Sequence, residues 1–146
     1  MKTEKLERLG DFSSLSFEQP SVVSDGFHLK LLFDSKLPIV AGGKVSKLIT
    51  AVRFKTAIAC YFGLPNDEAL SGHPLYEQGL EPYRAYEVRG SSWIAELSRR
   101  NAVHPNHRSD SFDEMHHYLF TFKDELFECV ASGYELEVEG ANEKSA

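Results

Sequence analysis

The stretch HHYLFTFKDELFECVASGYELEVE, from His116 to Glu139, decides the fold. Its apolar side chains alternate with a period of two on both sides of an acidic turn, at Tyr118, Phe120 and Phe122 and then at Phe127, Cys129 and Ala131. A two-residue loop at Asp124-Glu125 would place Phe122 opposite Phe127. The next pair inward would be Phe120 and Cys129. This register puts the whole apolar set on one face, so the stretch predicts an antiparallel hairpin over residues 118–131.

The second strand of this hairpin changes its alternation at Ser132-Gly133. Its apolar residues are odd-numbered through Ala131 and even-numbered from Tyr134 onward. A straight strand would turn the glutamates at 135, 137 and 139 toward the core, whereas a bulge at Ser132-Gly133 keeps them in water. The alternative is that the strand ends at Ala131 and a new one begins after a turn. The three glutamates predict a solvated face, with an acidic docking surface as the second interpretation.

Similar alternation indicates further strands upstream. FHLKLLF at 27–33 and YRAYEV at 83–88 each predict a short strand. KLITAVRFKTAIACYFG at 47–63 predicts the longest strand, because its residues are rich in β-branched types and keep a period of two. A strand of that length should bend or break once.

A helix and a long loop separate the later strands. Ser91 or Ser92 is expected to cap the helix SWIAELSRRN, which would bury a stripe containing Trp93. Residues 64–82 are rich in glycine and proline and predict an extended loop. Together the patterns predict the α+β class, with a curved antiparallel sheet of five to six strands and one main helix packed on it.

The length of 146 residues indicates one domain. Residues 1–20 are polar and end in a proline, so they predict a loosely attached N-terminal arm. Residues 21–140 are expected to form the single globular domain, and residues 141–146 a flexible tail.

Charge and cysteine usage exclude several classes of protein. The chain has 16 Lys plus Arg against 22 Asp plus Glu, and its net charge of −6 argues against binding to nucleic acid. It has no apolar run of about 18 residues that would span a membrane, and its first residues are charged, unlike a secretory signal. Cys60 and Cys129 are its only cysteines. We therefore expect a cytoplasmic protein whose two thiols are reduced and buried on apolar strand faces.

Motifs for metal or cofactor chemistry are absent from the sequence. HPNH, with His104 and His107, has a spacing that zinc sites use but lacks a cysteine pair or an HExxH partner. His116 and His117 are adjacent in a predicted strand and should point to opposite faces. There is no GxSxG motif and no phosphate-binding loop. We expect no metal and no cofactor, and the sequence identifies no catalytic residue.

The remaining candidates for a site are aromatic and imidazole side chains near glycine and proline. Such groups are common in binding sites, and they are equally common as anchors that hold loops on a sheet. The candidate ligand-binding residues are His73, Tyr76, Tyr86, Trp93, His104, His107 and His117. Convergence of these side chains in one concave pocket would favour ligand binding or catalysis, and scatter would favour a role in protein interaction.

Three stretches carry a resemblance: HHYLFTFKDELFECVASGYEL, GHPLYEQGLEPYRAYEV and SSWIAELSRRNAVHP. Over roughly residues 70–136 the chain resembles a family of small bacterial proteins of unknown function. The resemblance implies a free-standing bacterial domain, and it implies no activity, cofactor or site.

We therefore expect a cytosolic binding or interaction domain whose ligand is a small molecule or a protein. One alternative is a small hydrolase-like enzyme that uses histidine and carboxylate residues of the long loops. Another is an acidic protein that masks a basic partner, as immunity proteins do. Association into a homodimer is left open.

Overall fold

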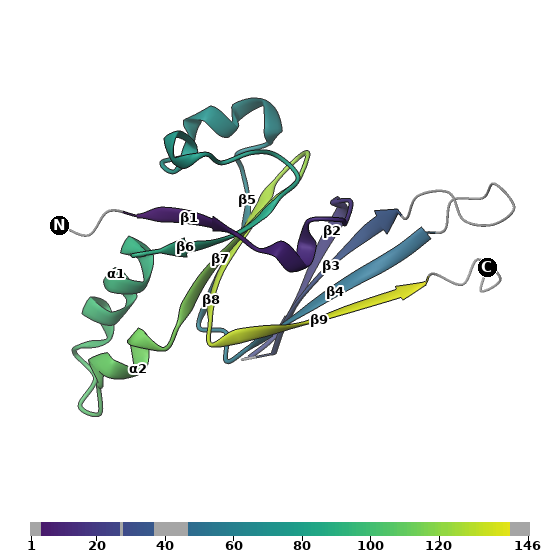
Figure 1. The fold of residues 1–146 in the computed structure, drawn as a ribbon. Helices are drawn as coiled ribbons and strands as arrows, with labels where there is room; N and C mark the ends of the chain where they lie inside the picture. Colours follow the sequence, from purple (N-terminus) through teal and green to yellow (C-terminus); the bar gives the residue numbers. More distant parts are fainter. Residues whose placement is uncertain (1–3, 27, 37–46, 141–146) are drawn as a thin grey trace, which may run out of the picture.

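The computed structural model describes residues 4–26, 28–36 and 47–140. Within these ranges the chain forms nine strands in two antiparallel sheets, with few helices (Figure 1). This confirms the α+β class. One of the sheets has five strands, as expected, and a second sheet of four strands lies beside it.

The five-stranded sheet has the order β1-β6-β7-β8-β5. In this order the bounds are Lys5–Arg8, Ala85–Arg89, His116–Thr121, Leu126–Ala131 and Ala59–Gly63. The four-stranded sheet has the order β2-β3-β4-β9. Its strands span Glu18–Asp25, His28–Lys36, Lys47–Lys55 and Gly133–Gly140.

Two segments of chain pass directly from one sheet to the other. The predicted long strand breaks between β4 and β5, where Thr56 has a φ of 49°, so the expected break is confirmed. The other crossing is Ser132, between β8 and β9. The change of alternation at Ser132-Gly133 therefore marks the end of one strand and the start of another, the second of the two alternatives. The bulge preferred from the sequence is wrong, because the two strands belong to different sheets and meet at a corner.

The main core lies between the two sheets and is aromatic. Phe120 is fully buried at its centre, with the rings of Phe12 and Phe54 edge-on at centroid distances of 5.0 and 6.1 Å. Phe12 and Phe17 are only 2% and 3% exposed. Burial of one such ring contributes roughly 1.5–3 kcal/mol.

The prediction of a loosely attached arm over residues 1–20 is therefore wrong for its described part. Lys5–Arg8 forms β1 and pairs with β6. A 3-10 helix, η1 (Gly10–Phe12), then carries Phe12 into the core. The predicted tail at 141–146 lies outside the described residues.

The predicted hairpin forms between β7 and β8, and its apolar side chains share one face as expected. The residues that lie opposite one another differ from those predicted. Phe120 lies opposite Phe127 and Tyr118 lies opposite Cys129. The amide of Phe122 donates to the carbonyl of Glu125 at 3.0 Å, so the two-residue loop is Lys123-Asp124. Moving the loop by one residue shifts the register by two, which changes every pair and leaves every side chain on its predicted face.

The outer face of the five-stranded sheet carries a second, smaller core. Tyr86, Leu119 and Leu126 are buried there under residues from the 64–82 segment, chiefly Leu70, Leu75 and Leu80. This segment contains two 3-10 helices, η2 (Asp67–Gly72) and η3 (Tyr76–Gln78), and lies at one end of the sheet in Figure 1. Both faces of this sheet are therefore covered in part.

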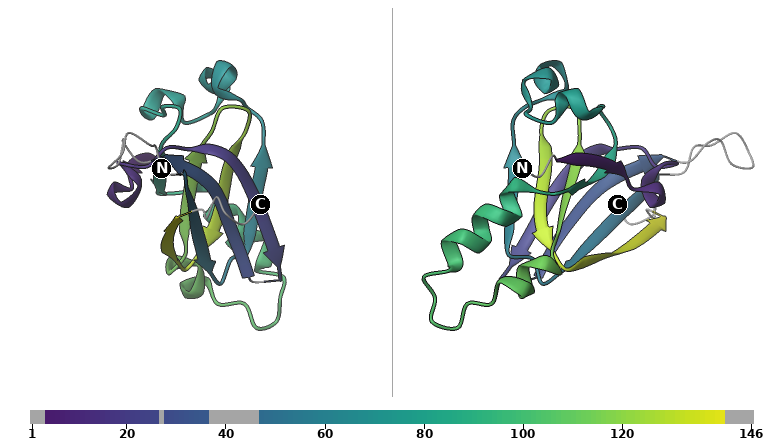
Figure 2. Two further views of the ribbon diagram at one scale, coloured as in Figure 1. Left: turned by 90° about the vertical axis from the view of Figure 1, so that its right-hand side faces the viewer. Right: turned by 60° about the vertical axis from the view of Figure 1, so that its left-hand side comes forward.

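The helices α1 (Ser92–Asn101) and α2 (Ser109–Asp113) project from the same sheet at its other end (Figure 2). Ser91 caps α1 by accepting from the amide of Ile94 at 3.2 Å, which confirms the predicted start. No residue of α1 is fully buried, so the predicted buried stripe is wrong. Trp93, Ile94 and Leu97 are partly exposed, because the helix contacts the sheet mainly through its first turn. No helix in the described ranges is long and apolar enough to cross a membrane.

The two cysteines differ in burial. Cys129 is fully buried in the core, as expected. Cys60 is exposed, and the expectation of burial is wrong because β5 lies at the edge of its sheet. The glutamates of β9 have the predicted solvated placement where they are described: Glu135 and Glu137 lie 3.3 and 3.4 Å from Lys55 and Arg53.

Candidate functional site

Three polar side chains meet on the outer face of the five-stranded sheet. His117 of β7 and Glu128 of β8 are diagonal neighbours there, since His117 pairs directly with Val130. His73, between η2 and η3, approaches from the covering segment. Nε2 of His117 is 2.7 Å from Oε1 of Glu128, and Nε2 of His73 is 3.3 Å from Oε2. We call these three residues the His–Glu–His cluster.

The cluster is largely buried and has an ionised carboxylate at its centre. The side chains of His117, His73 and Glu128 are 5%, 8% and 15% exposed. Burial opposes ionisation of Glu128, but hydrogen bonds from His117 and then His73 outweigh it and lower the pKa of this carboxyl to about 2. Glu128 therefore carries a full negative charge at neutral pH.

The tautomer of His73 follows from its backbone contact. The amide of Leu75 donates to Nδ1 of His73 at 3.0 Å, so that nitrogen carries no proton. The ring proton is therefore on Nε2, from which it is donated to Glu128. In this arrangement His73 is neutral.

A serine and a tryptophan extend the cluster toward α1. Oγ of Ser91 is 2.7 Å from Nδ1 of His117 and already accepts from the amide of Ile94. With His117 neutral, the Ser91 hydroxyl donates to Nδ1 and the Nε2 proton is donated to Glu128. The ring of Trp93 lies edge-on to His117, with centroids 5.1 Å apart. The start of the helix thus fixes one side of the cluster.

A cavity of about 520 Å³ opens beside the cluster. Its aromatic and aliphatic walls come from β5, the 64–82 segment and α1. The residues that line the cavity are Glu4, Tyr61, Leu64, Pro65, Gly72, His73, Pro74, Leu75, Ser92, Trp93, His117 and Glu128. Glu4 accepts from the amide of Ser92 at 2.9 Å, at the positive end of α1. Two carboxylates and no lysine or arginine are found among these lining residues.

The donor geometry argues against a metal at this cluster. A histidine that binds a metal through one nitrogen normally donates from the other. His73 accepts at Nδ1, so binding through Nε2 would require a ring without any proton. Among the described residues no group of three or more His, Cys, Asp or Glu side chains has an arrangement that could hold a metal ion.

The same contacts limit acid–base chemistry. Every ring nitrogen of His73 and His117 already has a partner within the protein, so neither ring offers a free nitrogen to a substrate. A carboxyl with a pKa of about 2 is also a weak base. The arrangement is better suited to holding a charge in place than to moving a proton.

The structure brings together three of the predicted site residues, His73, Trp93 and His117, in this cavity. Tyr86 is 2% exposed and has a structural contact: its hydroxyl accepts from the amide of Glu81 at 2.9 Å. Tyr76 is 44% exposed on η3, outside the cavity lining. Of the candidate residues, these two tyrosines therefore do not converge on the cavity.

His104 and His107 are also remote from the cavity. They follow α1 in an exposed loop and make local contacts. Nδ1 of His107 is 3.0 Å from the side-chain nitrogen of Asn101, and Nδ1 of His104 accepts from the amide of Asn106. Their rings stabilise the turn that leads to α2, which is why they do not reach the site.

Sequence reasoning missed Glu128, the residue at the centre of the cluster. The acidic pairs that attracted attention lie in loops, whereas Glu128 lies inside a strand. The sequence did contain an indication of this residue, because Leu126 and Val130, which share its face of the strand, are both apolar. A carboxylate between apolar neighbours on a covered face is costly unless it has hydrogen-bond partners.

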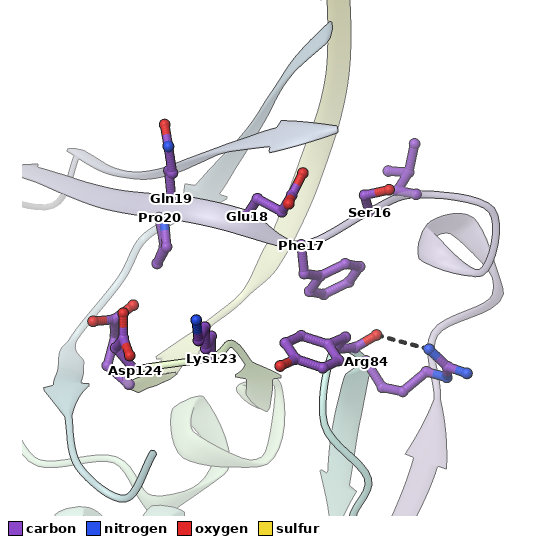
Figure 3. A pocket seen from close by; sticks show the side chains of 11 residues that line it. Ser16, Phe17, Glu18, Gln19, Pro20, Arg84, Lys123 and Asp124 are labelled. Carbon is purple, nitrogen blue, oxygen red and sulfur yellow. Dashed lines mark hydrogen bonds between the residues drawn. The ribbon is translucent and has the colours of Figure 1, made fainter. Parts of the chain in front are cut away.

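A larger cavity of about 760 Å³ lies between the start of β2 and the β7–β8 turn (Figure 3). Arg84 and Lys123 line it together with the carboxyl groups of Glu18, Asp124 and Glu125. Burial, and then the charge of Asp124, raises the pKa of Glu125. Because charges of both signs are interspersed along this groove, its lining favours no single class of ligand.

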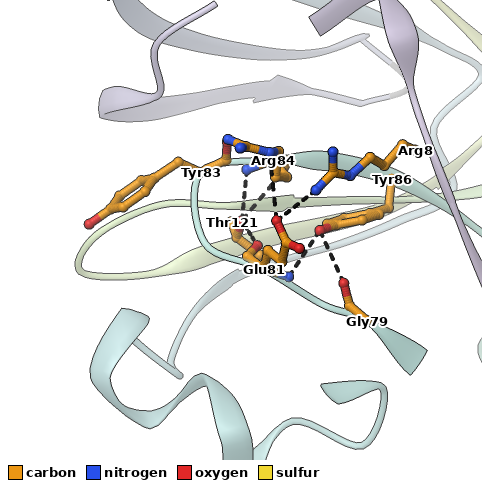
Figure 4. Close-up of polar contacts among 7 residues, drawn as sticks. All are labelled: Arg8, Gly79, Glu81, Tyr83, Arg84, Tyr86 and Thr121. Atoms are coloured by element: carbon orange, nitrogen blue, oxygen red, sulfur yellow. Dashed lines mark hydrogen bonds and ion pairs between the residues drawn. The ribbon is translucent and has the colours of Figure 1, made fainter. Parts of the chain in front are cut away.

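Polar contacts around Glu81 hold the end of the 64–82 segment against the sheet (Figure 4). The hydroxyl of Thr121 donates to the carbonyl of Glu81 at 2.7 Å, and the Arg8 guanidinium lies 2.6 Å from the Glu81 carboxylate. Together with Tyr86 these contacts fix the segment that carries His73.

Comparisons with protein-family models, with curated proteins and with solved structures found no match to this chain. The function must therefore be argued from the chemistry of the cavity.

Proposed function

We propose that the protein is a binding domain whose cavity takes a cationic group, a guanidinium or an ammonium, on a small molecule or a basic side chain. The observation that carries the proposal is the lining itself. It combines the carboxylates of Glu128 and Glu4 with aromatic rings, and its described residues include no lysine or arginine.

The charge of the His–Glu–His cluster supports the binding of a cation in the cavity. Glu128 is ionised and His73 is neutral, so in the arrangement with His117 neutral the cluster has a net negative charge. Each carboxylate oxygen of Glu128 accepts one N–H, and a carboxylate has about four lone-pair positions. Capacity remains for a donor that enters from the cavity. A charge-assisted hydrogen bond in such a partly buried place is roughly twice as strong as a neutral one.

The walls support the same class of ligand. Trp93 and Tyr61 both line the cavity, and the faces of aromatic rings attract cations. The Tyr61 hydroxyl donates to the carbonyl of Leu64 at 2.8 Å, which fixes its ring beside the opening. The aliphatic stem of a lysine or arginine would contact the leucine and proline residues of the rim.

The sole tryptophan provides a direct test. Trp93 lines the cavity and is the only tryptophan in the chain, so its fluorescence reports on this site alone. Titration with N-acetylarginine amide should give a saturable change, and the neutral citrulline analogue should bind at least about tenfold more weakly. Equal responses to the two compounds, or no saturable response, would refute the proposal.

Two variants test whether the carboxylate of Glu128 is the group that binds the cation. Glu128→Gln removes the charge and should weaken binding of N-acetylarginine amide by about tenfold or more. Glu137→Gln on β9 is the matched control, because it removes a carboxylate from the solvated face of the other sheet. Circular dichroism should show that both variants are folded.

One observation favours a second candidate, a hydrolase-like enzyme whose residues lie in strands and at the start of α1 and not, as expected, in the long loops. Ser91, His117 and Glu128 form a chain with both heavy-atom distances at 2.7 Å, the connectivity of a nucleophile, a base and an orienting acid. Ser91 is, however, only 9% exposed and caps α1. A fluorophosphonate probe that labels the folded chain, but not Ser91→Ala, would establish this alternative in place of simple binding.

A further inference from the structure

We infer that the open edge of β5 pairs with an extended peptide, and that a lysine or arginine side chain of this peptide enters the cavity beside it. This inference rests on the proposed function, since it uses the same anionic cavity. It adds the kind of partner and the way in which the partner is held.

The four edge strands of the two described sheets differ in how they discourage pairing. Charged residues and proline on an edge, and irregular register, prevent association with further strands. β1 has the sequence KLER, β2 contains Pro20 and a register shift after Glu18, and β9 alternates glutamates. β5, with the sequence ACYFG, has neither charge nor proline. It is the edge that is left open to pairing.

Apolar side chains lie exposed on both sides of this edge. Tyr61 and Phe62 are 46% and 42% exposed, and Leu64 just beyond the strand is 69% exposed. Tyr61 faces the cavity side, and Phe62 faces the opposite side because strand neighbours alternate. An added strand would cover both.

The backbone groups of β5 have the orientation that pairing requires. The carbonyl of Val130 accepts from the amide of Ile58 at 2.9 Å, so the even-numbered residues of β8 turn their backbone groups toward β5. Their partners on β5 are residues 59, 61 and 63. By the alternation of antiparallel ladders, the N–H and C=O groups of Cys60 and Phe62 point to the open side.

The register connects the edge to the cavity. Tyr61 lies directly opposite Glu128. A peptide residue opposite Tyr61 on the open side would share its face, and its backbone would be about two strand spacings, roughly 10 Å, from β8. A long basic side chain at that position would cross the Tyr61 ring and bring its charge to Glu128.

Charge selects this partner over a second copy of the chain. Two copies joined through β5 would place two anionic cavities near one another, and each chain has a net charge of −6. A basic peptide instead neutralises the cavity while its backbone extends the sheet. Strand addition with pockets for alternate side chains is an established way of binding peptides.

The probe is a short blocked peptide in which valine and threonine alternate around one central arginine. Measured by Trp93 fluorescence, it should bind at least about tenfold more tightly than N-acetylarginine amide, because ladder hydrogen bonds add to the contact of the guanidinium. A peptide with the same sequence and N-methylated amides on the pairing side should lose this gain. A peptide with glutamate in place of arginine should not bind.

A protein variant tests the same edge. Phe62→Pro removes an N–H that points away from β8, so it should abolish the peptide's advantage without removing a hydrogen bond between β5 and β8. If this variant fails to fold, the N-methylated peptide still decides the question on the unaltered chain.

The outcomes separate the two claims. If N-acetylarginine amide binds and the peptide binds no more tightly, or N-methylation has no effect, the pairing inference is overturned and the proposed function stands. If neither compound binds, the proposed function fails and the inference fails with it. Sedimentation that shows a dimer, lost in Phe62→Pro and unaffected by the peptide, would assign the edge to a second copy and overturn the peptide partner.

Discussion

Glu128 is the residue on which the electrostatics of the site depend. Its neighbours on the same parity of β8 are apolar, and it is ionised because His117 and His73 both donate to it. An unpaired carboxylate in this place would be neutral or would destabilise the fold. The two histidines therefore hold a buried negative charge in place beside the cavity.

The lowered pKa of Glu128 predicts an acid-dependent loss of stability. The pKa falls from 4.5 to about 2 on folding, so its contribution is present above pH 4.5 and is lost as the pH falls toward 2. The shift corresponds to roughly 3 kcal/mol. Urea unfolding of the wild type should therefore weaken between these pH values by more than that of Glu128→Gln. Parallel pH profiles for the two proteins would contradict the assignment.

His73 should be locked in one tautomer. Because the Leu75 amide donates to Nδ1, the ring proton should be on Nε2 at neutral pH. Nitrogen-15 NMR of the imidazole distinguishes protonated from unprotonated ring nitrogens. A protonated Nδ1 in the folded state would show that this contact is not formed and that the neutral charge assigned to His73 is incorrect.

The two cysteines should react at very different rates. Cys60 is exposed, whereas Cys129 is fully buried and burial raises the pKa of its thiol. A thiol reagent should label one equivalent rapidly in the native protein and the second on unfolding. Cys60→Ser should remove the rapid phase, and a rapid phase that persists in this variant would contradict the burial of Cys129.

At the scale of elements, the alternation of apolar residues predicted correctly which face of the sheet each side chain of β7 and β8 occupies. It did not predict which residues lie opposite one another across the two strands. The faces of β7 and β8 follow directly from the sequence, but their register depended on whether the loop is 123–124 or 124–125. A two-residue shift preserves every face, so the pattern could not distinguish the two. β1 was missed for a related reason: KLER has one apolar residue, and its partner β6 lies far along the chain.

The first turn of α1 combines two contacts in one side chain. Ser91 accepts from Ile94 and contacts His117, so Ser91→Ala should remove both the helix cap and the partner of a buried ring nitrogen. We expect a loss of about 1–3 kcal/mol in the free energy of unfolding. Ser92→Ala is the control, since its hydroxyl makes a longer, exposed contact with Glu4 at 3.2 Å. Equal losses in urea denaturation of the two variants would contradict this account.

At the scale of the molecule, the site lies on the opposite face of the five-stranded sheet from the main core. The aromatic core between the sheets fixes the positions of β7 and β8, and the 64–82 segment adds His73 from above. The sequence shows that this segment is long, but it does not show where it folds. The convergence of His73 with His117 therefore could not be predicted, whereas the two core-facing strand patterns could.

The most direct test of the central claim is a crystal structure of the chain grown with N-acetylarginine amide. We predict that the guanidinium lies against the Glu128 carboxylate, between Trp93 and Tyr61, with the His–Glu–His cluster unchanged. An empty cavity at saturating ligand, or a ligand bound only elsewhere, would contradict the claim that this cavity binds cations.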